Sequence, residues 1–135
     1  VMIVCNRVDD PDIQPTIFIQ LEVGPEVLTG STRMKSGTAQ KMTLNMISTT
    51  AMVLLGKCYG NLMVDLKATS EKLAARSRKI LIDLLEIDLE TADRLLAESG
   101  GSVKTAIAMQ RLKIGRQEAE RRLEEVGGSL WKLLD

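Results

Sequence analysis

The chain lacks histidine altogether and holds very few aromatic residues. Without histidine it has no Ser–His or Cys–His nucleophilic pair and no His-ligated metal site. Any acid–base chemistry in this chain therefore falls to Glu, Asp, Lys or Tyr side chains. Aromatic residues make up 2% of the 135 residues, which argues against a surface that stacks nucleic-acid bases. Because 44% of the residues are hydrophobic, we expect a core built from Leu, Ile, Val, Met and Ala.

Net charge and long apolar runs are missing as well. The 18 basic and 18 acidic residues balance, so no basic excess attracts a phosphate backbone. The longest apolar stretch, residues 42–55, is interrupted by Thr, Asn and Ser and makes a poor membrane span. The two cysteines, Cys5 and Cys58, lie far apart in apolar surroundings and predict buried free thiols rather than a disulfide. We expect neither a nucleic-acid nor a membrane partner.

Two short apolar segments at residues 2–5 and 16–23 predict β-strands. Neither segment alternates between polar and apolar residues, as is typical of strands buried on both faces of a parallel sheet. Such sheets are covered by helices, which indicates an α/β fold. Two strands do not make a stable open sheet alone. We therefore expect partner strands from preceding sequence or from another copy, so that this chain would be a fragment.

Two long helical patterns follow. The first runs from Lys35 or Thr38 to Tyr59 and is apolar nearly all round, which is typical of a helix buried in a sheet layer or a subunit interface. Gly60 and Asn61 end it, and residues 62–66 form a short apolar connection. The second helix is predicted over residues 68–86, with one apolar stripe.

The last third of the chain predicts a compact module of short helices. Asp88, Ser102 and Ser129 are candidate N-caps for helices at 89–98 and 103–112 and for a final turn that contains Trp131. A further helix is expected at 116–126. Ion pairs four residues apart, Glu118–Arg122 and Arg121–Glu125, would stabilise its exposed face.

One small core is expected to hold this module together, and the module should also lean on the preceding helix. The predicted core residues are Leu89, Ala92, Leu95, Leu96, Val103, Ala106, Ile107, Leu112, Ala119, Leu123, Val126, Leu130 and Leu134.

The segment between the second strand and the first helix holds most of the chemistry. Residues 23–41 bring together Glu26, Thr29, Ser31, Thr32, Arg33 and Lys35. They do not form a P-loop, because Met34 stands where that motif needs glycine. Ligands of parallel sheets bind at the carboxyl ends of strands, and hydroxyls with free helix-start N–H groups suit a phosphate or a sugar hydroxyl.

Two interpretations of this segment stay open from the residues alone. Cations at a helix start repel its positive end by about 0.3–1 kcal/mol each, and a bound anion would offset that penalty. In the alternative, Ser31 or Thr32 only caps the helix, while Arg33 and Lys35 are solvated. The small residues at 36–39 allow the backbone of another helix or of a ligand to approach closely, and helix packing is the expected use. Lys104, at the start of a predicted helix, is expected to be a surface charge.

Two longer runs resemble a known family. VGPEVLTGSTRMKSGTAQKM, followed by LGKCYGNLMVDLKATSEKL, is similar to the carboxyl half of N-acetylmuramic acid 6-phosphate etherases. These enzymes carry a sugar isomerase (SIS) domain and are related to the glucokinase regulatory protein. SGGSVKTAIAM and GGSLWKLL resemble the helical tail of the family, which is similar in shape to ubiquitin-associated (UBA) domains.

The resemblance implies a partial SIS-type doubly wound parallel sheet followed by a small all-α, three-helix, UBA-like module. Its boundaries would be residues 1–66 for the SIS portion, 67–87 for a connecting helix and 88–135 for the tail. The implied activity is cleavage of the D-lactyl ether of N-acetylmuramic acid 6-phosphate in the cytoplasm, by a homodimer without metal or other cofactor. A non-enzymatic phosphosugar-binding regulatory protein of the same superfamily is the alternative.

The resemblance also implies where the functional residues lie. The catalytic glutamates of the family are expected before Val1, so no catalytic role is assigned within this chain. The segment from Glu26 to Lys35 would line the sugar-phosphate pocket. Glu26 would contact sugar hydroxyls, while Ser31, Thr32, Arg33 and Lys35 would sit near the phosphate or fix the loop.

Overall fold

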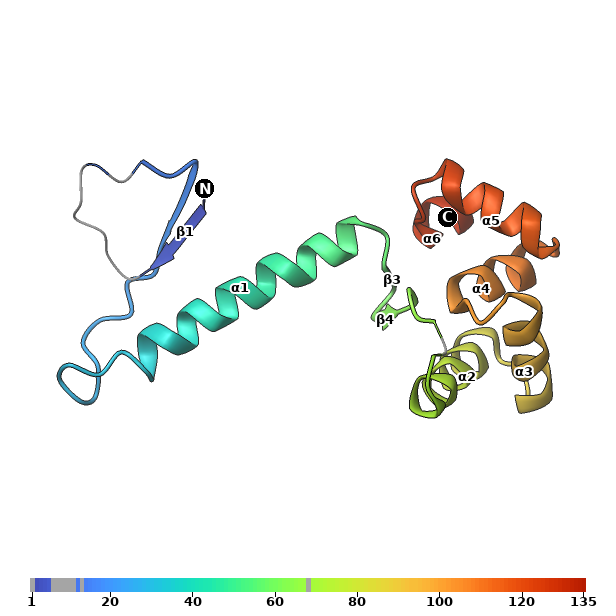
Figure 1. Ribbon diagram of the computed structural model, residues 1–135, viewed down its shortest axis with the longest axis horizontal. Coiled ribbons are helices and arrows are strands. Elements are labelled where there is room, and N and C mark those ends of the chain that lie inside the picture. Colours follow the sequence, from blue (N-terminus) through green and yellow to red (C-terminus); the bar gives the residue numbers. More distant parts are fainter. Residues whose placement is uncertain (1, 6–11, 13, 68) are drawn as a thin grey trace. The chain divides into compact units, whose positions relative to one another are not determined.

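The computed structural model describes residues 2–5, 12, 14–67 and 69–135. The chain divides into two compact units, residues 1–51 and 52–135, and each is described by itself. The first unit holds two strands and most of one long helix, and the second holds a small hairpin and a group of shorter helices (Figure 1). The assignment of residues 1–66, 67–87 and 88–135 to separate domains stays a prediction.

The two predicted strands of the first unit are confirmed and pair in parallel. β1 (Met2–Cys5) and β2 (Ile17–Gln20) pair in register from Met2 with Ile17 to Cys5 with Gln20. β2 is shorter than the predicted segment of residues 16–23. The expected burial of β2 is wrong for this chain, since Ile17 is 52% exposed. The predicted burial of residues 2–5, with the Cys5 thiol, lies outside the described side chains.

The long helix α1 (Lys35–Leu54) begins at the first of the two predicted residues but ends before Tyr59. The Gly56 N–H donates to the Val53 carbonyl and the Lys57 N–H to the Met52 carbonyl, at 2.9 and 3.1 Å. These two hydrogen bonds form a Schellman motif, in which the residue after the helix adopts a left-handed conformation. That residue is Gly56, with a φ of 68°. The sequence prediction missed this stop signal.

Contacts within the described part of the chain do not bury α1, contrary to the expectation from its composition. Thr43 is its buried residue, and its hydroxyl donates to the Ala39 carbonyl at 2.9 Å. Met46 is 59% exposed and Leu54 is 81% exposed. No described helix is both long and apolar enough to span a bilayer.

A hairpin replaces the predicted helical end and apolar connection. β3 (Cys58–Tyr59) and β4 (Leu62–Met63) pair antiparallel across a turn at Gly60 and Asn61. Cys58 is a free thiol, as predicted, although it is half-buried rather than buried. The Tyr59 ring packs on the Trp131 ring with centroids 4.9 Å apart, so the hairpin contacts the end of the chain.

The helices of the second unit follow the predicted capping signals. α2 (Glu71–Leu85) begins after Ser70, whose hydroxyl accepts from the Leu73 N–H, a cap that the sequence prediction missed. The predicted caps at Asp88, Ser102 and Ser129 are confirmed. The helices are α3 (Leu89–Glu98), α4 (Val103–Leu112), α5 (Arg116–Glu125) and α6 (Leu130–Leu134).

The predicted core of the module is largely confirmed. Ala92, Leu95, Leu96, Val103, Ala106, Ile107, Ala119, Leu123 and Leu130 are buried, and Leu134 packs against them. Leu89 was wrongly included, since it is the first residue of α3 and is 57% exposed. Leu112 and Val126, also predicted, are half-buried and do not belong to this core. Ile80 and Leu81 join the same core from α2, and Val64 joins it from the segment after the hairpin. The module therefore leans on the preceding helix, as predicted.

Gly56 serves a second role within this unit. A Cβ on Gly56 would lie 2.9 Å from the Ser129 Cα and 3.1 Å from the Gly128 carbonyl. The turn that ends α1 thus rests directly on the backbone before α6. A side chain at this position would meet backbone atoms that cannot rotate away.

We therefore predict that Gly56→Ala destabilises the second unit. A left-handed alanine costs about 1–2 kcal/mol, and the clash with residues 128 and 129 adds to this. Urea unfolding monitored by Trp131 fluorescence measures the change. Gly60→Ala is the matched control, because Gly60 also has positive φ but a Cβ there meets no atom within 4 Å. Equal losses for the two variants would show that the close approach contributes nothing.

Candidate functional site

The loop between β2 and α1 encloses the cavity to which the sequence prediction points. The cavity has a volume of about 330 Å³ and is lined by Gly24, Pro25, Glu26, Thr29, Gly30, Ser31, Thr32 and Ser36. Three of the five predicted site residues, Glu26, Ser31 and Thr32, thus line one cavity. Arg33 and Lys35 do not line it.

The carboxylate of Glu26 lies at the amino end of α1. Its two oxygens accept hydrogen bonds from the Lys35 N–H at 3.1 and 3.0 Å, and one of them accepts from the Ser36 N–H at 3.0 Å. These are two of the helix-start N–H groups that have no partner inside a helix. Glu26 therefore occupies the place where a bound anion was expected.

These bonds change the acidity of the carboxyl group. Hydrogen bonds from the backbone N–H of Lys35, and then from that of Ser36, hold the pKa of Glu26 below its ordinary value. The group is ionised at neutral pH, so a full negative charge faces the positive end of the helix. The penalty expected from Arg33 and Lys35 at the helix start is offset from within the chain.

Lys35 fixes the loop from the other direction. Its ammonium group donates to the Pro25 carbonyl at 2.7 Å. Of the two roles predicted for Lys35, proximity to phosphate or fixing of the loop, the second matches this contact. Arg33 has an exposed side chain, and its backbone N–H lies 3.5 Å from the Ser31 hydroxyl oxygen.

The small residues after Lys35 accommodate the loop's own backbone. The Gly37 N–H donates to the Thr32 carbonyl at 2.9 Å, and a Cβ on Gly37 would lie 3.3 Å from that oxygen. The sequence prediction favoured another helix as the approaching backbone; within the described residues it is the segment at Thr32. This contact holds the Thr32 side of the cavity against the first turn of α1.

A second polar cluster, which the sequence prediction missed, lies in the second unit. Asp65 accepts from the Lys57 ammonium at 2.5 Å and forms an ion pair with Lys104 at 3.3 Å. The hydrogen bond from Lys57, with the nearby charge of Lys104, lowers the pKa of Asp65. The predicted surface position of Lys104 is wrong, since its side chain is only 12% exposed. A lysine at the second position of a helix is disfavoured by the dipole, and that was the available signal.

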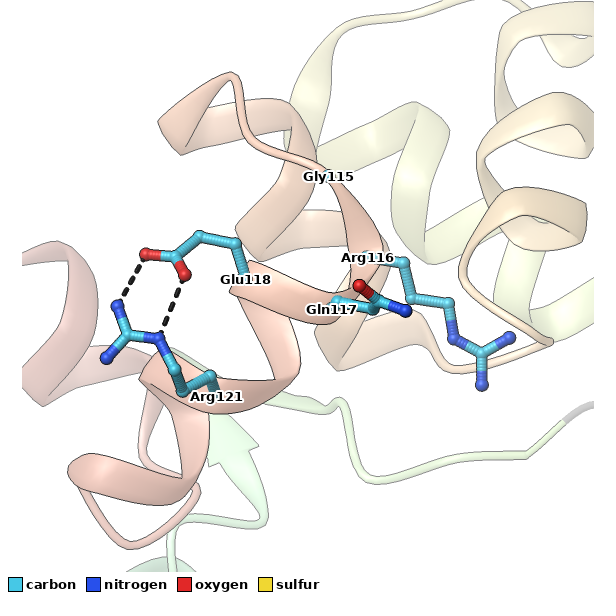
Figure 2. Close-up of a pocket in the computed structure, with 5 residues that line it drawn as sticks. All are labelled: Gly115, Arg116, Gln117, Glu118 and Arg121. Carbon is cyan, nitrogen blue, oxygen red and sulfur yellow. Dashed lines mark hydrogen bonds and ion pairs between the residues drawn. The ribbon is translucent and has the colours of Figure 1, made fainter.

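An open depression of about 570 Å³ lies at the start of α5. It is lined by Gly115, Arg116, Gln117, Glu118 and Arg121. Figure 2 shows Glu118 joined to Arg121, with the Arg116 side chain pointing away from that pair.

The charged groups of this depression are paired along α5. Glu118 accepts from Arg121 and from Arg122, each with a closest distance of 2.7 Å, which lowers the pKa of Glu118 to about 2. Arg116 donates to Glu120 at 2.8 Å. Both predicted pairs, Glu118–Arg122 and Arg121–Glu125, are confirmed. These ion pairs stabilise the helix. The charged groups of the depression are therefore occupied by one another, and the depression is less suited to bind a ligand than the loop cavity.

No group of three or more Cys, Asp or Glu side chains suited to a metal ion occurs among the residues that the structure describes. The polar groups of the loop cavity are hydroxyls, backbone amides and one carboxylate. The hydroxyls of Thr29, Ser31 and Thr32 can exchange hydrogen bonds with a hydroxyl-rich ligand.

Comparison with curated proteins identifies relatives of the chain, although no family model matches it. An N-acetylmuramic acid 6-phosphate etherase from Geobacillus thermodenitrificans is 47% identical over 98% of this chain and 45% of its own length. Those of Mycolicibacterium smegmatis and Deinococcus radiodurans are 48% and 50% identical, over 96% and 86% of this chain. By sequence, the chain is homologous to the carboxyl-terminal part of N-acetylmuramic acid 6-phosphate etherases.

The chain spans less than half the length of the etherases that it matches. At 98% coverage, the match with the Geobacillus etherase takes in both the loop cavity and the Lys57–Asp65–Lys104 cluster. The two polar constellations therefore lie in a segment that is related to these enzymes throughout.

We predict that Asp65→Asn destabilises the second unit by about 1 kcal/mol at neutral pH, because it leaves the nearly buried Lys104 without its ion pair. Since the pKa of Asp65 is lowered on folding, its contribution is present above the unfolded value of about 3.9. The contribution is lost as the pH falls through the lower folded value. The difference in unfolding free energy between the native chain and the variant should thus shrink below about pH 4.

Denaturant unfolding from pH 7 to pH 3 measures this difference. Asp83→Asn is the control, because Asp83 forms a more exposed pair with Lys79 within α2. A difference that stays constant down to pH 3 would contradict the role of the Asp65 charge.

Proposed function

We propose that this chain is the carboxyl-terminal part of a lyase that acts on N-acetylmuramic acid 6-phosphate. The products would be N-acetylglucosamine 6-phosphate and D-lactate, formed by elimination of the lactyl group and addition of water. The observation that carries the proposal is identity of 45–50% to proteins named as this etherase, over nearly the whole chain. The catalytic acid and base are placed outside the chain, in agreement with its share of the relatives' length.

The loop cavity supplies part of the phosphosugar site in this proposal. Thr29, Ser31 and Thr32 bring hydroxyl groups to the cavity wall, where they can bond sugar hydroxyls or phosphate oxygens. Arg33 follows directly, and its exposed guanidinium is free to turn toward a phosphate at the edge of the cavity. The roles of Ser31, Thr32, Arg33 and Lys35 in binding are predictions.

The fold assignments that accompany this function are proposals too. The parallel pair β1 and β2 followed by α1 supports a partial SIS-type sheet. The three helices α3, α4 and α5 around one core support a UBA-like tail. A cytoplasmic homodimer is proposed from the resemblance, and the exposed apolar side chains of α1 are suited to a subunit interface.

Release of D-lactate from N-acetylmuramic acid 6-phosphate tests the function. The assay compares this chain alone with a longer protein that also contains the amino-terminal sequence encoded upstream in the same gene. We expect turnover by the extended protein and none by the chain alone. Full turnover by the chain alone would contradict the placement of the catalytic groups. Phosphosugar binding by the extended protein without lactate release would instead favour the regulatory alternative.

Within the extended protein, Arg33→Ala should raise KM for the phosphosugar about tenfold to a hundredfold, because a charge-assisted hydrogen bond contributes about 1.5–3 kcal/mol. Steady-state kinetics provide the measurement. Lys41→Ala is the matched control, since Lys41 is an exposed cation on α1 beyond the cavity. If KM is unchanged in both variants, Arg33 is a surface residue and not part of the site.

A further inference from the structure

We propose that Glu26 is a positioning residue that holds the loop of residues 25–36 in shape, rather than a ligand of the sugar. This proposal deepens the proposed function and rests on it only for the identity of the ligand. It departs from the role that the resemblance implies for Glu26. Three observations support it: the hydrogen bonds of the carboxylate, the loop closure that they produce, and the few acceptor positions that the carboxylate has left for a ligand.

One carboxylate joins the two ends of the loop. Glu26 lies nine residues before Lys35 and ten before Ser36, yet it accepts from the backbone N–H of both at 3.0–3.1 Å. Ordinary caps act across two or three residues, so this contact is a long-range closure. It fixes where the loop leaves Pro25 relative to where α1 begins.

Lys35 makes a second contact that closes the loop. Its side chain returns to the Pro25 carbonyl, which directly precedes Glu26, at 2.7 Å. Residue 35 is therefore held through its backbone by Glu26 and holds residue 25 through its side chain. The hydroxyl-bearing residues Thr29, Ser31 and Thr32 lie inside the segment that this pair of contacts closes. A loop fixed before binding loses less entropy when the ligand arrives.

The carboxylate has little capacity left for a sugar. An ionised carboxylate offers about four lone-pair positions, and three hydrogen-bond contacts already point at Glu26. A sugar hydroxyl would compete with charge-assisted bonds to the helix start, which are stronger than neutral ones. The backbone N–H groups of Lys35 and Ser36 already donate to Glu26, so a phosphate must be bound by other donors.

Amide hydrogen exchange of the chain without ligand tests the proposal. In Glu26→Ala, the N–H groups of Lys35 and Ser36 should exchange about 2- to 30-fold faster, which corresponds to the loss of a helix cap. The two roles predict different results here. A residue that only binds the sugar would leave both amides unchanged in the absence of ligand.

Glu26→Gln is the second variant, in case the alanine variant does not fold. The amide keeps one oxygen, which can still accept from Ser36, while the Lys35 N–H loses one of its two acceptor atoms. Lys35 should therefore exchange faster than in the native chain and be affected more than Ser36. Glu22→Gln is the matched control, because its carboxylate lies on the same segment and accepts from the exposed Gln20 side chain.

Kinetics of the upstream-extended protein complete the test. Loss of positioning in Glu26→Ala should raise KM more than it lowers kcat, and Glu26→Gln should restore most of the loss. Unchanged exchange at Lys35 and Ser36 in both variants would overturn the proposal, whatever the kinetics. Absence of lactate release from the unsubstituted protein would instead overturn the proposed function and leave the exchange result standing.

Discussion

The contact between the Glu26 carboxylate and the first N–H groups of α1 determines the geometry of the candidate site. Without it, the helix would begin with unpartnered donors beside Arg33 and Lys35, and the loop would be closed only through Lys35. With it, an internal anion offsets the helix dipole and the nearby cations. The hydroxyl-lined wall of the loop cavity lies in the segment that is closed where residues 25 and 26 contact residues 35 and 36.

The second unit depends on a comparable set of non-local contacts. The turn that ends α1 rests on the backbone of Gly128 and Ser129, and Tyr59 of the hairpin packs on Trp131. Asp65 joins Lys57 to Lys104 on α4. These contacts attach residues 56–65 to the helical module, whose own core comes from α2 to α6. The hairpin is thus part of the module and not a free linker.

The features that the sequence predicted correctly are those set by neighbouring residues. Asp88, Ser102 and Ser129 cap helices through contacts three residues ahead, and the predicted pairs on α5 lie four residues apart. The positions of β1 and β2 followed from their short apolar runs, although the burial from which a parallel sheet was predicted is not seen for β2. In each case the physical cause lies within one or two turns of chain, where spacing alone reveals it.

The features that the sequence did not reveal depend on residues brought together by folding. The closure by Glu26 spans nine residues, and the pairing of Asp65 with Lys104 spans a much larger separation. Gly56 was passed over because the apolar pattern continues into the hairpin, which hid the end of α1. For the candidate site, the residue types and their segment were predictable, whereas the division between lining residues and loop-fixing residues required the structure.

The central claim is that the Glu26 carboxylate is ionised and bonded to the start of α1. A pH titration of the Glu26 side-chain carboxyl carbon by NMR tests it most directly. The account predicts a Glu26 midpoint clearly below the ordinary value of about 4.3, because the backbone N–H groups of Lys35 and Ser36 stabilise the charged form. A midpoint at or above that value would contradict it.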